Sequence, residues 1–297
     1  MIKKILSVAF IFIIYSLLFP SENKKVSVYT QQVSDRVYKF YADNSALVPY
    51  QVIVYVGKNR KEREKFYKII PEKSISNLLF IYTNSYKEEP FYITKTIIGD
   101  PNRVKIHEEY PYLLPFKNGE SFKVNQGYET RFTHRGWLKY SIDFGMKTGT
   151  PIYAARGGVV VAVKDTSRSG GRSRRYRGCA NYITIAHDDG SFAQYVHLMF
   201  GGSVVKEGDV VKAGDLIGYS GATGRVTGPH LHFMVYIPVE EGLQTIPVKF
   251  LTKDGELVSI KSKNYYTAYN PYTEESNITT RGENSFEEFD DESLGEP

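Results

Sequence analysis

In the first hundred residues, short apolar runs of β-like composition are separated by polar, turn-rich or charged stretches. The clearest runs lie at 36–41, 50–56, 77–83 and 91–98. Repeated short strands with turn signals between them favour an antiparallel sandwich. The pattern therefore predicts a small β-sandwich-like accessory domain over 25–100.

One stretch of this region has no β-like apolar run. Residues 58–68 are highly charged, which predicts a short helix or a solvated loop rather than a strand. The region contains no set of residues arranged for catalysis, which favours a spacer or docking role for it.

Glycine-punctuated strands follow a proline-containing linker, which we place at 101–120. Within 121–265 the apolar runs are again short, and 181–186 and 191–198 predict a hairpin across Asp188-Asp189-Gly190. No amphipathic helix of ordinary length occurs in this part of the sequence. Both domains are therefore predicted to be all-β.

The two ends of the chain depart from this globular pattern. Lys3 and Lys4 precede an uncharged apolar run that ends at Phe19, as in a secretory signal. The run is short for a bilayer span and lacks a small-x-small cleavage site, so 1–21 is either a signal peptide or an uncleaved anchor. Either reading predicts export to the periplasm or cell envelope, with membrane association if the segment is kept. The polar, acidic segment 271–297 is predicted to be disordered.

The net charge and the cysteine count limit the binding partners and the metal ligands that the chain can use. The net charge is +5, but the segment 271–297 holds nine acidic residues and one arginine, so the rest of the chain carries +13. A basic body suits an anionic partner such as cell-wall polymer or a membrane surface, and export makes nucleic acid the least favoured partner. Cys179 is the single cysteine, so an internal disulfide is excluded and any metal must be held by histidine and carboxylate.

The strongest chemical signal is a His-x-His pair at the start of an apolar strand-like run, 231–237. Residues two apart on a strand share a face, so His230 and His232 are directed at one point. Asp143 lies between two apolar residues, where a carboxylate is costly to bury without a partner. A catalytic zinc takes three protein ligands and leaves a position open, and His134, Asp143 and one of the paired histidines supply such a set. His197 and the remaining histidine would then lie beside the bound water.

Several ordered motifs resemble the lysostaphin/LytM-type zinc endopeptidases, which cut peptide bonds in peptidoglycan. The resemblance covers about 125–235, little more than a third of the chain, and its motifs are His134…Asp143-Phe144, Gly149-Thr150-Pro151-Ile152-Tyr153-Ala154-Ala155, Tyr195-Val196-His197-Leu198, Gly208-Asp209-Val210-Val211 and Gly228-Pro229-His230-Leu231-His232-Phe233.

That resemblance implies a fold of the duplicated hybrid motif type and a function in cell-wall remodelling. It also implies one zinc ion held by His134, Asp143 and His232, with His197 and His230 as the catalytic pair. The best-known members place the ligand aspartate four residues after the histidine, whereas here Asp143 lies nine residues after His134. The intervening loop, which contains Trp137, is therefore expected to reshape one rim of the cleft.

Other functions remain to be weighed against this one. Lipoyl and biotinyl carriers and sugar-phosphotransferase domains share the glycine-rich strand pattern, but no exposed hairpin lysine is evident and the export signal disfavours a cytoplasmic role. A non-enzymatic activator of other wall hydrolases would have lost ligand positions, and all five are present. A wall-binding protein without activity would bind sacculi without clearing them.

An arginine-rich stretch lies just before the first strand of the predicted hairpin. Five arginines fall within 167–178 among serine and glycine residues. The pattern is typical of a mobile, solvated loop, and its charge also suits a flap that contacts substrate carboxylates. The neighbouring Cys179 is interpreted as a small packed residue rather than a nucleophile.

Overall fold

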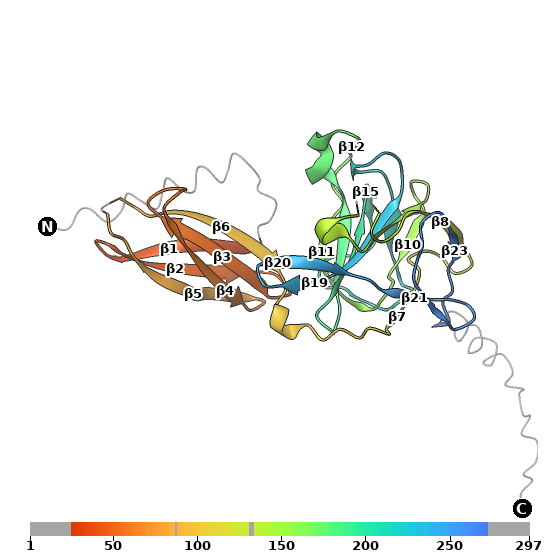
Figure 1. The fold of residues 1–297 in the computed structure, drawn as a ribbon, viewed down its shortest axis with the longest axis horizontal. Helices are drawn as coiled ribbons and strands as arrows, with labels where there is room; N and C mark the ends of the chain where they lie inside the picture. Colours follow the sequence, from red (N-terminus) through yellow and green to blue (C-terminus); the bar gives the residue numbers. More distant parts are fainter. Residues whose placement is uncertain (1–24, 87, 131–133, 273–297) are drawn as a thin grey trace, which may run out of the picture. The chain divides into compact units, whose positions relative to one another are not determined.

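The computed structural model describes residues 25–86, 88–130 and 134–272, and β-strands dominate them (Figure 1). These residues form two compact units. The first contains the described residues up to Asn102 together with Pro238–Gly242, and the second contains Arg103–Ile237 and the described residues from Leu243 onward. This confirms the prediction of an all-β protein.

The first unit is built from two three-stranded antiparallel sheets. Their strand orders are β1-β2-β5 and β4-β3-β6. The strands are β1 Val26–Ser34, β2 Val37–Asn44, β3 Tyr50–Gly57, β4 Arg63–Ile70, β5 Ser74–Thr83 and β6 Phe91–Ile98. Phe40 from β2 and Val54 from β3 are buried in a shared core, where Phe80 stacks on Phe40 at 4.5 Å between ring centroids. Burial alternates along β2, as expected for a strand with one face in the core.

The charged stretch predicted as a helix or loop, 58–68, is different in the structure. Its second half is part of β4, which pairs with β3 in continuous register from Gly57↔Arg63 to Tyr50↔Ile70. The strand lies at the edge of its sheet, where Glu64 and Lys65 are exposed while Ile70 is buried. Charged residues are tolerated on an edge strand and protect it from pairing with other chains. The prediction was wrong for 63–68, because strand pairing is not visible in local composition, whereas 58–62 form an exposed loop between β3 and β4.

The second unit contains a nine-stranded sheet with the order β16-β11-β13-β14-β19-β9-β8-β23, in which β20 also pairs with β19. Its strands are β8 Ser121–Gln126, β9 Ser141–Gly145, β11 Gly158–Lys164, β13 Tyr182–Ala186, β14 Phe192–Val196, β16 Val210–Val211, β19 Leu231–Val239, β20 Gly242–Ile246 and β23 Tyr265–Thr267. β13 and β14 form the hairpin predicted from the sequence.

Three smaller sheets complete this unit, with the orders β10-β17-β15, β12-β18 and β22-β21-β7. Their strands are β7 Pro111–Tyr112, β10 Pro151–Tyr153, β12 Gly170–Gly171, β15 Leu198–Ser203, β17 Leu216–Ser220, β18 Gly224–Arg225, β21 Lys249–Leu251 and β22 Leu257–Val258. Three short 3-10 helices are also present, η1 Pro101–Arg103, η2 Gly136–Leu138 and η3 Arg174–Cys179.

The core of the second unit lies between these sheets. Phe144, Tyr195 and Phe233 are among its largest fully buried side chains. Part of the segment predicted as a linker also belongs to this core, since Tyr112 and Phe116 are both 3% exposed. Proline content alone does not separate a linker from a packed irregular segment.

The signal or anchor predicted at 1–21 lies outside the described residues, and so does the acidic segment 271–297, predicted to be disordered, except for its first two residues. Within the described ranges, no helix has the length and apolar character needed to cross a bilayer.

Candidate metal centre

The site begins with the pairing of two strands. β9 and β19 run antiparallel in a register that places Asp143 opposite His232. The Nδ1 atom of His232 lies 2.8 Å from Oδ1 of Asp143. The strand alternation that buries Ile142 and Phe144 leaves the intervening Asp143 on the histidine face of the sheet. Two residues 89 positions apart in sequence are thus joined by backbone register.

His134 approaches the same carboxylate from the loop after β8. Its Nδ1 lies 2.8 Å from the carbonyl oxygen of Gly127. A carbonyl oxygen can only accept, so Nδ1 carries the proton of the neutral ring and Nε2 presents its lone pair. That Nε2 atom lies 3.3 Å from Oδ1 of Asp143 and has no hydrogen-bond partner in the described residues, although the side chain is fully buried.

Asp143 is held in place from its other side. Oδ2 accepts a hydrogen bond of 2.8 Å from the Gln126 side-chain amide. Burial by itself would raise the pKa of Asp143, but the adjacent rings of His134 and His232 lower it well below its usual range. For His134, burial lowers the pKa but the neighbouring carboxylate more than compensates and raises it. Asp143 therefore remains an anion and attracts positive charge to this point.

Two further histidines face the same carboxylate. His197 and His230 each direct Nδ1 at a backbone carbonyl, that of Thr223 at 2.7 Å and that of Gly228 at 2.9 Å. Each neutral ring therefore keeps its Nε2 as a proton acceptor. Nε2 of His230 lies 3.8 Å from Oδ1 of Asp143, and the His197 and His230 ring centroids are 4.7 Å apart. Burial, followed by the neighbouring histidines, lowers the pKa of His197 to about 3.

The backbone of His197 adopts an uncommon conformation. Its φ angle is +70°, in the left-handed region that non-glycine residues occupy at a cost of about 1–3 kcal/mol. The carbonyl of Asn181 accepts hydrogen bonds from the amides of His197 at 2.9 Å and Leu198 at 3.3 Å. The backbone amide of Asn181 also donates a hydrogen bond to Oγ1 of Thr223 at 3.0 Å. The same residue thus fixes the backbone of His197 and the segment that orients its ring.

The geometry tests whether a metal fits. The ligand atoms of His134, Asp143 and His232 lie within 4.8 Å of one another. Nε2 of His134 and Oδ1 of Asp143 are both acceptors, yet they face each other in a buried place. Two facing acceptors repel unless a proton or a cation lies between them. Two imidazoles and one carboxylate form the donor set of an open zinc site, so these residues fit that ion.

The five predicted site residues are therefore brought together, and three others support them. Gln126 holds Asp143, Asn181 holds His197, and the Thr223 carbonyl orients the His197 ring. Composition and spacing did not identify these three, since neutral amides and a carbonyl are ordinary surface groups. Gln126 ends β8 and Asn181 directly precedes β13, and neither strand carries a candidate site residue, so no local pattern links these two residues to the site.

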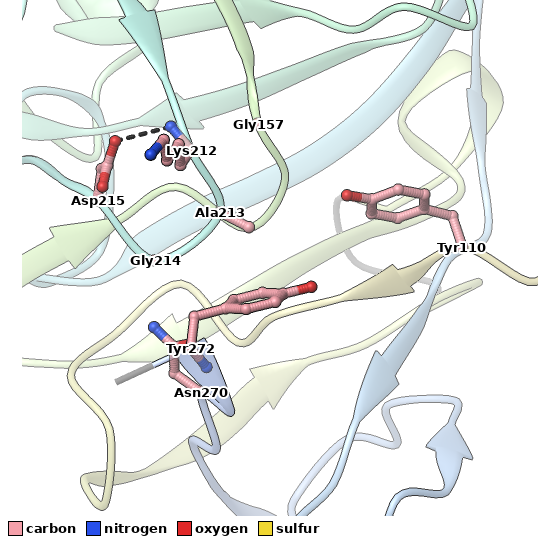
Figure 2. A pocket seen from close by; sticks show the side chains of 8 residues that line it. All are labelled: Tyr110, Gly157, Lys212, Ala213, Gly214, Asp215, Asn270 and Tyr272. Carbon is pink, nitrogen blue, oxygen red and sulfur yellow. Dashed lines mark hydrogen bonds between the residues drawn. The ribbon is translucent and has the colours of Figure 1, made fainter. Parts of the chain in front are cut away.

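The remaining histidines lie apart from this cluster. His107 is exposed, while His187 is buried and directs Nδ1 at the carbonyl of Gly157 at 2.8 Å. A pocket in the second unit also contains none of the four clustered histidines. It is lined by Tyr110, Tyr272 and the glycine-rich turn that includes Gly214 (Figure 2).

Comparison with known proteins identifies the class of this site. Residues 138–247 match the model of peptidase family M23. The second unit of the chain therefore contains a family M23 peptidase domain, as the resemblance predicted.

Individual relatives agree with this family. The peptidoglycan DD-endopeptidase ShyA of Vibrio cholerae is 37% identical over 124 residues, which are 41% of this chain and 26% of that protein. Lysostaphin of Staphylococcus simulans is 41% identical over 99 residues, 33% of this chain and 18% of that protein. Among solved structures, the catalytic domain of the prophage-encoded M23 protein EnpA from Enterococcus faecalis is 30% identical, covering 44% of this chain and 92% of that one, with a TM-score of 0.34. The matches span 18–37% of the lengths of the curated relatives.

Proposed function

We propose that this protein is a zinc-dependent endopeptidase that hydrolyses peptide bonds in peptidoglycan. The observation that carries the proposal is the pair of buried acceptors, Nε2 of His134 and Oδ1 of Asp143, 3.3 Å apart beside His232. The family match and the relatives named as peptidoglycan endopeptidases support the substrate class. We further propose that the protein acts in the cell envelope, where that substrate lies.

His134, Asp143 and His232 would hold the ion. Zinc in such a site makes a hydroxide nucleophile available near neutral pH and polarises a carbonyl. The protein supplies the proton transfers and the orientation. Backbone carbonyls take up Nδ1 of His197 and of His230 and leave Nε2 of each ring available, so these two rings would accept the proton of the attacking water, stabilise the developing oxyanion and protonate the leaving amine.

The alternative is a protein that binds the wall, or activates other hydrolases, without catalysis. Such a protein has no need for facing buried acceptors or for a second pair of oriented imidazoles. Retention of all five histidine and carboxylate positions in one cluster favours an enzyme. The expected accessory role of the first unit, as a spacer or docking domain, stays part of the proposal.

Digestion of purified sacculi tests this function. Mass spectrometry of the released muropeptides should show new peptide ends, and a chelator should abolish them. His107→Ala is a matched control, because this histidine is exposed and outside the cluster. Binding to sacculi without release of peptides, in protein that carries a full equivalent of zinc, would contradict the proposal and favour the wall-binding alternative.

A further inference from the structure

One end of the second unit carries a dense group of unpaired arginines. Five exposed arginines and Arg225 form what we call the arginine surface, and the five are Arg168, Arg172, Arg174, Arg175 and Arg177. Within the part of the chain that the structure describes, none of them forms an ion pair with a carboxylate. Positive charge collected without internal partners is available to an external anion.

The segment that carries these arginines is attached to the wall of the histidine site. β12 pairs in parallel with β18, Gly170 opposite Gly224 (β12 is labelled in Figure 1). The amides of Gly224 and Val226 donate to the carbonyls of Ser169 at 2.9 Å and Gly171 at 3.1 Å. A Cβ at position 170 would collide with the Ala222 carbonyl, so glycine is needed for this close approach. The expected mobile loop is thus hydrogen-bonded to the strand that follows Thr223.

Asn181 closes the base of the same segment. Its Oδ1 accepts from the Ser167 amide at 2.9 Å, and its Nδ2 donates to the Ser167 carbonyl at 2.9 Å. Asn181 is fully buried, and its own carbonyl accepts from His197. The two ends of the segment 167–181 are therefore hydrogen-bonded to each other, and the residue at its second end, Asn181, holds the backbone of His197. Its other attachment, β18, directly follows the residue whose carbonyl orients the same ring.

Several of the guanidinium groups are held in place rather than freely solvated. Arg168 stacks on the ring of Phe200 at 3.4 Å, and Arg175 donates from Nη2 to the Tyr176 hydroxyl at 2.6 Å. Arg225 donates from Nε to the carbonyl of Arg172 at 3.4 Å. Orienting a planar guanidinium in advance reduces the entropy lost when it binds a carboxylate through two parallel hydrogen bonds.

We propose that the arginine surface binds free carboxylates of the substrate peptide next to the bond that is cut, and so selects acidic over amidated peptides. This inference rests on the proposed function. The adjacency to His197, through Thr223 and Asn181, favours a substrate group over an anionic membrane as the ligand. A carboxylate bound at the arginine surface would belong to the same peptide as the carbonyl group that reaches the histidines.

Two synthetic cross-link peptides test the proposal, identical except that the free carboxylates of one are amidated in the other. The wild-type protein should cut the acidic peptide with a kcat/KM about tenfold higher, expressed mainly in KM and reduced by added salt. In the variant Arg168→Gln/Arg172→Gln/Arg175→Gln this ratio should fall to about one. The control Lys58→Gln/Arg60→Gln/Lys61→Gln removes the same charge from the exposed β3–β4 turn and should keep the wild-type ratio.

Binding is measured in parallel by titration calorimetry with both peptides, so that the surface is tested even without turnover. Tighter binding of the acidic peptide by wild type but not by the triple variant supports the proposal. Equal binding of both peptides by wild type overturns it, while cleavage of both would leave the proposed function standing. If cleavage of both peptides and of sacculi fails although acidic-peptide binding is selective, the proposed function fails and the surface assignment stands. Loss of binding to phosphatidylglycerol vesicles by the variant, without a change in peptide preference, would assign the surface to membranes.

Discussion

Among the described residues of the second unit two aspartates are buried, and their surroundings differ in one respect. Asp189 and Asp143 are 3% and 6% exposed. Asp189 has an internal cation, since Nη1 of Arg156 donates to its Oδ2 at 2.7 Å, and the Ser191 amide and hydroxyl donate to its Oδ1. Asp143 has no lysine or arginine beside it in the described residues and faces only imidazole and amide groups.

This difference separates a structural charge from a functional one. The Arg156 guanidinium is itself covered by Tyr110 at 3.9 Å and bonded to Tyr112 at 3.2 Å, so that cluster is complete without an external partner. The Asp143 cluster contains acceptors that face each other and is complete only with a proton or a cation between them. A buried charge that is left uncompensated by the chain is thus a sign of a binding site.

The largest effect is expected when the open cluster, which consists of Asp143 and its histidines, is broken. Asp143→Ala and His232→Ala remove one of three ligands, so zinc should fall well below one equivalent and turnover should drop by at least about 10³-fold. Elemental analysis and sacculus digestion measure both quantities. Full zinc content in either variant would place the ion elsewhere.

A slightly smaller loss should follow from changes to the other two histidines. His197→Ala and His230→Ala leave the three ligands in place, so the metal should be retained while turnover falls by about 10²–10⁴-fold, the usual contribution of acid–base groups. Zinc stoichiometry next to single-turnover rates separates the two roles. Loss of the metal in one of these variants would make that histidine a ligand.

Substitutions in the closed cluster, which consists of Asp189 and Arg156, should change the stability of the protein rather than its metal content. Asp189→Ala leaves Arg156 buried beside only the exposed Asp188, which should cost roughly 3 kcal/mol in the free energy of unfolding. The double variant Arg156→Met/Asp189→Leu removes both charges and should lose less than the single variant. Urea unfolding of both proteins measures this. Equal destabilisation of the single and the double variant would show that attraction within the ion pair stabilises the fold, and that the unpaired Arg156 charge adds no further cost.

The smallest effect concerns pH and His187, which packs beside the closed cluster. Burial, followed by the charge of Arg156 and opposed by Asp188 and Asp189, lowers the pKa of His187 to about 4. The unfolded chain takes up this proton near pH 6.5 and the folded chain only near pH 4, so stability is fully present above pH 6.5 and falls as the pH drops. Between pH 7 and 5 the loss should be about 2 kcal/mol.

His187→Phe removes the titrating group while keeping an aromatic ring beside Tyr112, with which the histidine makes an edge contact. Unfolding free energies of this variant should vary less between pH 7 and 5 than those of wild type. An unchanged slope would assign the pH dependence to other groups.

Much of the fold and of the candidate site follows from the sequence. Short apolar runs punctuated by turns predicted strands in both units, and His-x-His at a strand start placed two imidazoles on a common side. Residue chemistry selected His134 and Asp143 as partners, since a carboxylate between apolar neighbours requires one. These inferences depend on local patterns and on the cost of burying charge.

Tertiary structure decided what depends on distant contacts. The pairing of β9 with β19 set the distance between Asp143 and His232, and the carbonyls of Gly127, Thr223 and Gly228 fixed which nitrogen of each ring is available. The charged β4 became a strand only through its pairing with β3, and the arginine-rich segment became part of the site wall only through β18. Backbone hydrogen bonds between segments far apart carry no side-chain signature, so composition and periodicity do not reveal them.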